Sequence, residues 1–341
     1  MRRLILHRSR TGGGLARLAV LLLLASPPAS AQAVGAQPGA GVSVVFTALG
    51  RDGKAVRDIK VDDLKLSVDG APVQPTGLKR QEDGPVFFTV AIDTSASQEK
   101  MLPTTRVVAG LFIKSMMRPG LDKAAVVTFS NDVTVEQELT GDVSKALEAV
   151  ERVQFVPPSG YIGNGIMVGN PPPPGTARNT GATSMWDAVS QVGEKAMPRS
   201  LGAGRRVLLL ITDGVDTSSS VKSNKAVAAA LESGVVVYAI GIGDAGFDGV
   251  DKNSLRKVAE RTGGRAFFPK KVADVTESFR QISGGLSSQY LLTFAPAGAA
   301  RDGSFHKLKI EVVNPALREQ GVELAYPQEY YSGGAPTAPK Q

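Results

Sequence analysis

An uninterrupted apolar run that ends in a polar cluster is the feature that most constrains this fold. Residues Val86 to Ser97 read VFFTVAIDTSAS, so apolar side chains fill nearly every position before Asp93. Such a run is typical of a strand that is buried on both faces, as in a parallel sheet covered by helices. Asp93, Ser95 and Ser97 then fall at the carboxyl end of that strand. Their carboxylate and hydroxyl oxygens are hard ligands, which favours a hard divalent cation over covalent chemistry.

Strands and helices alternate after this point and predict an α/β fold. Apolar runs end at Phe129, Ile211 and Ile240, and segments with helical periodicity separate them. This alternation predicts a doubly wound, mostly parallel sheet with helices on both faces. Val133–Leu139 alternates between apolar and polar residues, as an edge strand does. The expected helices cover 101–117, 143–153, 183–196, 225–232, 255–262 and 272–286, with Ser184 and Asp187 as a capping box for the third of them.

Short β segments flank the α/β region on both sides. Before it, Val42–Leu49, Leu64–Val68 and Val73–Leu78 read as strands, and Asp69-Gly70 predicts a hairpin turn between the last two. Neither flank has enough strands to bury a face alone. We therefore expect residues 42–84 and 287–331 to pair into one small β-sandwich, with the α/β domain of residues 85–286 inserted between them. The expected strands of the second flank are Tyr290–Phe294, Lys307–Val313 and Val322–Tyr326.

The first residues predict export. Arginines precede the apolar run Leu18–Ala25, and Ala29-Ser30-Ala31 resembles a cleavage site, so residues 1–31 read as a signal peptide. A membrane anchor is the alternative, although this run is shorter than the roughly 20 residues that a span needs. No later segment approaches that length. We expect a periplasmic, cell-surface or secreted protein, with a flexible lead-in at 32–41 and a disordered tail at 332–341.

Composition excludes several classes of function. The leader holds five arginines and no acids, so its removal lowers the formal net charge from +7 to +2 and argues against a nucleic-acid partner. The chain has no cysteine, which excludes thiolate catalysis and thiolate zinc sites. His306 is the only histidine after the leader, which argues against most hydrolase triads.

A second carboxylate is expected beside the first. Asp213 closes the apolar run Val207–Ile211, and ligands in doubly wound sheets bind beyond the carboxyl ends of the strands. If the two strands are neighbours, Asp93 and Asp213 converge on one crevice. Thr183, which follows a long loop and precedes a helix, can supply a further oxygen. This set suits Mg²⁺ or Mn²⁺ with some waters retained.

These motifs resemble the von Willebrand factor type A domain over about Pro85 to Leu286. D-x-S-x-S after a buried strand, Gly181-Ala182-Thr183 and Thr212-Asp213-Gly214 match the positions of its metal-ion-dependent adhesion site. The resemblance implies that Asp93, Ser95, Ser97, Thr183 and Asp213 hold the metal, some directly and some through water. It also implies that an Asp or Glu carboxylate of a partner protein completes the metal shell.

The layout of signal peptide, α/β domain and β flanks is similar to that of the secreted acidobacterial-type proteins of the same superfamily. One departure is the Pro/Gly-rich loop Pro157–Gly181, which is longer than usual in the family and borders the expected site. We expect this loop to influence which partners fit.

The sequence thus predicts an exported, non-enzymatic, adhesion-type module that binds a protein partner through a metal ion. One alternative is a structural envelope scaffold with a degenerate metal site. Another is a metal-dependent phosphotransfer enzyme with Asp93 as phosphoacceptor, but Thr94-Ser95 follows Asp93 where such enzymes usually carry another acid. Asp216 is expected in a turn and Trp186 in helix packing.

Two further motifs have ordinary explanations. Gly241–Gly246 matches the spacing of a dinucleotide-binding loop, but no helix opens directly after it and Glu260 comes too early for the ribose partner. Asp248 and Asp251 could form a second cation site, whereas a solvated loop explains them as well.

Overall fold

The computed structural model describes residues 41–51, 54–81, 84–158, 161–163, 181–197, 201–202, 204–243, 249–295 and 304–332. The expected leader, nearly all of the lead-in and tail, most of the loop before Thr183, and residues 244–248 lie outside these ranges. Among the helices in the described ranges, none is long and apolar enough to cross a membrane.

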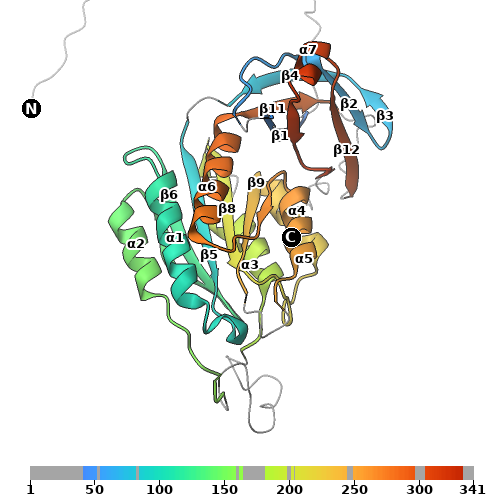
Figure 1. The fold of residues 1–341 in the computed structure, drawn as a ribbon. Helices are drawn as coiled ribbons and strands as arrows, with labels where there is room; N and C mark the ends of the chain where they lie inside the picture. The colour runs from blue at the N-terminus through green and yellow to red at the C-terminus, as the bar shows by residue number, and fades with distance from the viewer. Residues whose placement is uncertain are drawn as a thin grey trace, which may run out of the picture. The chain divides into compact units, whose positions relative to one another are not determined.

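A six-stranded sheet forms the centre of the α/β region, with strand order β10-β9-β8-β5-β6-β7 (Figure 1). All neighbours are parallel except β6 and β7, which pair antiparallel at the edge. The expectations of a mostly parallel sheet and of an edge strand near Val133 are confirmed. The strands are β5 (Val86–Asp93), β6 (Lys123–Phe129), β7 (Val133–Thr140), β8 (Arg205–Thr212), β9 (Val235–Gly241) and β10 (Ala266–Phe267).

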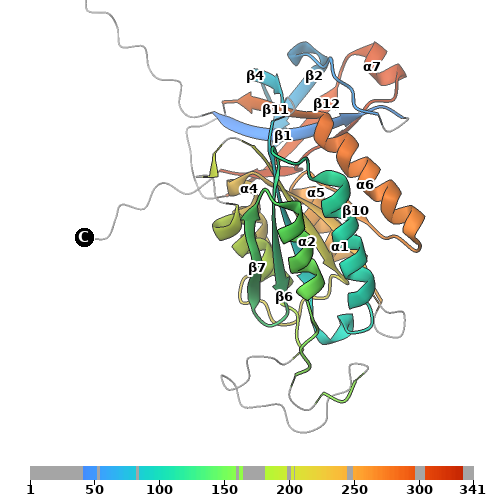
Figure 2. The ribbon, with the colours of Figure 1, turned by 90° about the vertical axis from the view of Figure 1, so that its left-hand side faces the viewer.

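Helices cover both faces of this sheet, because side chains of a buried strand alternate between two cores. On β5, Phe88 and Ile92 join one apolar cluster, while Phe87 and Ala91 join the other. In Figure 2 the sheet is seen from its β7 edge, and the helices of the first cluster lie to the right of β7 and β6. They are α1 (Leu102–Met116), α2 (Val143–Arg152) and α6 (Val272–Ser287), whereas α3 (Met185–Gln191), α4 (Ser223–Ser233) and α5 (Lys252–Arg261) pack in the second cluster.

The two flanks pair with each other, as expected. β1 (Val42–Leu49) pairs with β11 (Gln289–Phe294), and β2 (Leu64–Val68) pairs with β12 (Phe305–Val312), both antiparallel. They belong to two four-stranded sheets, β13-β1-β11-β4 and β14-β12-β2-β3. A shared apolar core, in which Phe46 and Tyr290 stack at 5.1 Å, makes these sheets a small sandwich.

One expected strand of the first flank is wrong. Residues Val73–Leu78 do not form one strand but divide between β3 (Ala71–Val73) and β4 (Pro75–Arg80), which lie in different sheets. Pro72 and Pro75 lack the N–H group that a continuous ladder requires, so the chain changes sheet at this corner. The structure also adds elements that the sequence pattern did not predict, namely the short helices η1 (Val61–Asp63) and α7 (Pro315–Glu319) and the strand β14 (Glu329–Tyr331), while β13 covers Glu323–Ala325.

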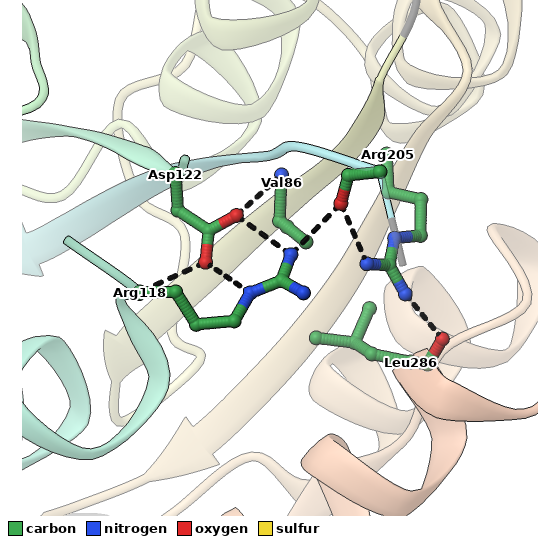
Figure 3. Close-up of polar contacts among 6 residues, drawn as sticks. Val86, Arg118, Asp122, Arg205 and Leu286 are labelled. Carbon is green, nitrogen blue, oxygen red and sulfur yellow. Dashed lines mark hydrogen bonds and ion pairs between the residues drawn. The ribbon is translucent and has the colours of Figure 1, made fainter. Parts of the chain in front are cut away.

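The chain passes twice between the sandwich and the α/β region, and the two crossings are side by side. The N–H of Gln81, at the end of β4, donates to the carbonyl oxygen of Gln289 at 2.8 Å. Just beyond, Arg205 donates to the carbonyl oxygens of Gly84 at 2.9 Å and of Leu286 at 2.6 Å (Figure 3). The start of β8 therefore ties the chain entering the α/β region to the chain leaving it.

A second arginine completes this polar clasp, which we define as Gly84, Arg118, Asp122, Arg205 and Leu286. Arg118 donates to the Gly84 oxygen at 2.8 Å and forms an ion pair with Asp122 at 2.8 Å (Figure 3). Asp122 also accepts the N–H of Val86, the first residue of β5, at 2.8 Å. Burial alone would raise the pKa of Asp122, but the hydrogen bonds from Arg118 and Val86 outweigh it and hold that pKa below its usual value.

Candidate metal centre

The two expected carboxylates lie at the same end of the sheet. β5 and β8 are parallel neighbours, and Ile92 is level with Ile211, so Asp93 and Asp213 leave their strands at adjacent positions. Both side chains are buried, with relative exposures of 1% for Asp93 and 3% for Asp213. The parallel pairing of β5 with β8 therefore brings both carboxylates to one end of the sheet, as the sequence pattern predicted.

The loop after β5 connects the two acids through its serines. The Ser95 N–H donates to Asp93 Oδ1 at 2.9 Å, which turns the loop back over the carboxylate. The Ser95 and Ser97 hydroxyl oxygens lie 3.3 Å apart, and the Ser97 hydroxyl donates to Asp213 Oδ2 at 2.6 Å. Both hydroxyls therefore belong to one polar network that runs from the β5 loop to the β8 loop.

Thr183 belongs to a second loop that is fixed against the other two. The Gly181 carbonyl oxygen accepts the N–H of Ala96 at 3.0 Å, and the Thr183 carbonyl oxygen accepts the N–H of Thr217 at 2.9 Å. The Thr183 N–H donates to the Thr217 hydroxyl at 2.9 Å. Within the described ranges the Thr183 hydroxyl makes no hydrogen bond, so its oxygen is available to a ligand.

The expected capping box at Ser184 and Asp187 is wrong. The Ser184 hydroxyl donates to the Ser130 carbonyl oxygen at 2.5 Å and does not cap α3. The Asp187 carboxylate accepts the N–H groups of Ser220 at 3.0 Å and Val221 at 2.9 Å. Ser184 and Asp187 therefore bond to neighbouring loops and not to the N–H groups at the start of α3. These contacts with distant residues take the place of the expected capping box.

Trp186 and Asp216 take the structural roles that were expected of them. Trp186 is partly buried and packs against the apolar cluster under α3. Asp216 accepts a hydrogen bond from the Ser219 hydroxyl at 2.5 Å within its own turn. Neither side chain contacts Asp93 or Asp213 in the hydrogen bonds of the described residues.

Two site residues escaped the sequence interpretation. Gln98 is 1% exposed and donates from Nε2 to Asp213 Oδ2 at 2.8 Å. The Thr212 hydroxyl donates to Asp93 Oδ2 and accepts the Gly214 N–H at 3.1 Å. The only sequence feature that could have identified Thr212 as a site residue was its place in the Thr-Asp-Gly motif. For Gln98 the only such feature was its closeness to Ser97 in the chain.

The electrostatics of this cluster favour a bound cation. Burial, and secondly the negative charge of Asp213, raise the pKa of Asp93 to about 7. No Lys or Arg in the described ranges forms an ion pair with either carboxylate. Among the residues that the structure describes, no group of three or more His, Cys, Asp or Glu side chains is placed to hold a metal either. A cation must therefore use the serine and threonine hydroxyls and water besides the two acids, which fits the oxygen ligands of Mg²⁺ and Mn²⁺.

The start of helix α5 packs against the loop that carries Asp213. The Asp251 N–H donates to the carbonyl oxygen of Asp213 at 2.7 Å. Gly214 has φ +85, and a Cβ there would lie 2.7 Å from Leu255 Cγ and 2.8 Å from the Asp251 oxygen. Asp251 itself caps α5 by accepting the N–H of Ser254 at 3.0 Å. This role explains Asp251 without a second cation site; Asp248 lies outside the described residues.

His306, the only histidine in the described ranges, has partners that resemble a triad in their order. His306 Nδ1 lies 2.8 Å from Asp69 Oδ2, and His306 Nε2 lies 3.1 Å from the Ser304 hydroxyl. The hydrogen bond from His306 lowers the pKa of Asp69. Acyl transfer also needs N–H donors for an oxyanion, but the Ser304 N–H already donates to the Ser332 hydroxyl at 3.2 Å. The array therefore joins β12 to the β2–β3 turn and β14 and does not by itself make a hydrolase site.

Comparison with known proteins identifies part of this region. Residues 175–281 match the family model of the von Willebrand factor type A domain. This match includes Thr183 and Asp213 but begins after Asp93, Ser95 and Ser97. No curated protein is similar enough to the chain to match it.

Several solved structures are similar at low sequence identity. Proximal thread matrix protein 1 from the mussel byssus, with a zinc-occupied MIDAS motif, is 16% identical over 62% of this chain and 50% of its own, with a TM-score of 0.45. This chain thus spans about half the length of that protein. A von Willebrand factor type A protein from Catenulispora acidiphila is 13% identical over 86% and 74%, with a TM-score of 0.46. Manganese-loaded TRAP from Plasmodium vivax is 16% identical over 76% and 98%, with a TM-score of 0.41.

Proposed function

We propose, on the premise that this chain carries a von Willebrand factor type A domain, that it is an exported binding protein which captures a partner carboxylate through Mg²⁺ or Mn²⁺. The observation that carries the proposal is the contact between the β5 and β8 loops, where the Ser97 hydroxyl reaches Asp213 beside buried Asp93. The signal-like leader supports export, and the partner is a protein that presents Asp or Glu.

Five residues would hold the cation. Asp93 supplies a buried carboxylate whose raised pKa a positive charge would lower again. Ser95, Ser97 and Thr183 supply neutral hydroxyl oxygens, and Asp213 contributes a second negative charge, directly or through water. If only one acid binds directly, the cation keeps positive charge at an open position. That position would accept a carboxylate oxygen from the partner.

The type of donor supports the choice of metal. All five side chains offer oxygen, and the chain has no cysteine, whereas structural zinc sites are built mostly from sulfur and nitrogen ligands. Zinc occupies the MIDAS motif of the mussel byssus protein, and the Plasmodium TRAP structure is loaded with manganese. Zn²⁺ therefore belongs in the test as a third ion, and we expect Mg²⁺ or Mn²⁺ to be the ion that supports partner binding.

Calorimetric titration of Mg²⁺, Mn²⁺ and Zn²⁺ tests the proposal. We expect saturable binding of Mg²⁺ or Mn²⁺ to the wild type and none to Asp93→Ala, since that substitution removes charge and a ligand together. Asp142→Ala is the matched control, because Asp142 is an exposed acid that caps α2. Equal affinity of wild type and Asp93→Ala for these ions would remove the metal from the mechanism.

Thr183→Ala separates partner binding from folding. Its hydroxyl makes no hydrogen bond in the described ranges, so the substitution should leave the melting temperature unchanged. We expect weaker capture of the partner in Mg²⁺, measured by pulldown from the native secretome with chelator as the reference. Capture that is the same in Thr183→Ala as in wild type would exclude Thr183 from the site.

Two other functions make different predictions. A structural scaffold with a degenerate site would bind its neighbours equally in Mg²⁺ and in chelator. A phosphotransfer enzyme would take up labelled phosphate on Asp93 from a phosphodonor, but Asp93 accepts the Thr212 hydroxyl and Ser95 N–H and has no described lysine partner. The non-enzymatic proposal therefore predicts no phosphate turnover in the presence of Mg²⁺.

A further inference from the structure

A basic surface adjoins the candidate metal centre along α5. Leu255, Val258 and Ala259 bury one face of this helix. Lys252, Arg256 and Lys257 are exposed positions of the same helix. We call these three side chains the α5 basic surface.

The α5 basic surface is anchored to the metal centre by backbone contacts. The Asp251 N–H donates to the Asp213 carbonyl oxygen at 2.7 Å, and Lys252 is the next residue along the chain. Gly214 leaves no room for a side chain between the β8 loop and α5. Lys252, the first residue of the α5 basic surface, is therefore the immediate neighbour in the chain of a residue that contacts Asp213.

Aromatic packing restrains two of the three cations. Lys252 Nζ lies 5.6 Å and Arg256 Cζ lies 5.3 Å from the centre of the Phe268 ring. A cation over an aromatic face is held by the ring quadrupole while it stays accessible to a ligand. Part of the side-chain ordering that a bound anion would require is therefore already present.

These cations have no acidic partner among the described residues. Lys252, Arg256 and Lys257 form no ion pair there, although Glu260 lies on the same helix. By contrast, Arg261 at the end of α5 is paired with Glu329 of β14. The surface also contains a cavity of about 350 Å³, lined by Asn253, Arg256, Lys257, Glu260, Arg261 and Gln328.

We propose that the α5 basic surface binds further Asp or Glu side chains of the partner whose carboxylate reaches the metal. This inference rests on the proposed function and assigns its partner class: a protein segment with several acids, not one isolated carboxylate. The ten residues of α5 extend about 15 Å, which an extended peptide covers in about five residues. The acids therefore lie within a short stretch of the partner sequence.

Peptide binding tests this inference. The probes are a fluorescein-labelled decamer of glutamate and a Gly/Ser decamer with one central glutamate, measured by anisotropy in Mg²⁺ at low and moderate salt. In the triple variant Lys252→Gln/Arg256→Gln/Lys257→Gln, we expect about tenfold weaker binding of the polyglutamate and a smaller salt dependence. Binding of the single-glutamate peptide should be unchanged, because it needs only the metal.

A charge-matched variant controls for net charge. Lys114→Gln/Lys123→Gln/Lys145→Gln removes the same three charges from exposed positions on α1, β6 and α2. The helices α1 and α2 pack in the cluster on the other face of the sheet from α5. We expect this control to bind polyglutamate as the wild type does, and thermal melts check that both variants are folded.

The outcomes separate this inference from the metal proposal. Unchanged polyglutamate binding in the α5 variant, or an equal loss in the control, would overturn the α5 basic surface. If chelator and Asp93→Ala leave both peptides bound while the α5 variant loses polyglutamate, the surface stands and the metal role fails. Tighter binding of a labelled single-stranded DNA that is also lost in the α5 variant would overturn the protein partner class.

Discussion

The Ser97 hydroxyl donates to Asp213 Oδ2 at 2.6 Å, although the two residues are 116 positions apart in the chain. Ser97 comes from the loop after β5 and Asp213 from the end of β8. Their contact shows that two separate sequence motifs form a single polar cluster. It also makes Ser97 a direct way to test the site without removing charge.

Ser97→Ala should weaken Mg²⁺ and Mn²⁺ binding by about 10- to 100-fold, as loss of groups that hold or orient a metal ligand does. Ser97→Thr keeps a hydroxyl and is the matched variant that should restore much of the affinity. Calorimetry on both variants measures the effect. Equal affinities of Ser97→Ala and wild type would show that this hydroxyl neither binds nor orients the metal.

Gly214→Ala should destabilise the fold by about 3 kcal/mol. Its φ of +85 is strained for alanine, and the added Cβ would meet Leu255 and the Asp251 carbonyl oxygen at under 3 Å. Urea denaturation measures the loss. Gly120→Ala is the control, because Gly120 has φ +75 but an added methyl group there would meet no atom within 4 Å, so only the backbone cost of about 1 kcal/mol remains. Equal losses of unfolding free energy in the two variants would mean that α5 is not closely packed against the loop after β8.

Asp122→Asn should remove a stabilising contribution that depends on pH. The folded-state pKa of Asp122 lies below its usual value, so ionised Asp122 stabilises the fold above the unfolded pKa of about 3.9. This contribution is lost as the pH falls through the folded-state pKa. We expect the free energy of unfolding of the wild type to exceed that of Asp122→Asn by about 2 kcal/mol at neutral pH. The reason is that the buried carboxylate forms an ion pair with Arg118.

Urea denaturation between pH 7 and about pH 3 follows that difference between Asp122→Asn and wild type. It should stay constant at neutral pH and shrink in acid. Exposed Asp142→Asn supplies the control for general acid effects. A difference between Asp122→Asn and wild type that persists in full at the lowest pH would show that the ionised carboxylate is not what stabilises the clasp.

Deletion of Gln289–Gln341 should unfold the first β flank. It removes β11 and β12, which are the partners of β1 and β2. Hydrogen exchange should then become fast at Val42–Leu49 and Leu64–Val68, while the β8 amides, which pair with β5 and β9, stay slow. Persistent protection of the β1 amides after the deletion would contradict the pairing.

Sequence patterns predicted the strands in which nearly every residue is buried. The apolar runs of β5, β8 and β9 were recognisable because nearly every side chain there is buried, whichever face it points to. The site acids followed from their place at the ends of such strands. The pairing of the flanks followed from the shortage of strands in each.

Elements that depend on distant partners were not predictable in this way. The break between β3 and β4 at Gln74 reflects two sheets that are completed by the other end of the chain. Ser184 has the local pattern of a cap, but a nearby carbonyl from another loop takes its hydroxyl. The Arg205–Gly84 contact joins residues 121 positions apart, and no local pattern marks either of them.

The adjacent crossings have a consequence for folding kinetics. β4 and β11 are antiparallel neighbours, and the whole α/β region lies between them in the sequence. The two strands therefore form a hairpin whose connecting loop is the α/β region. Closing such a loop from a disordered chain has an entropic cost that grows with the logarithm of its length. Once the α/β region has folded, Arg205 holds Gly84 beside Leu286. The entropic cost of bringing the two ends of this loop together has then already been met. We therefore expect β4 and β11 to pair after the α/β region has folded, at the entropic cost of a much shorter loop.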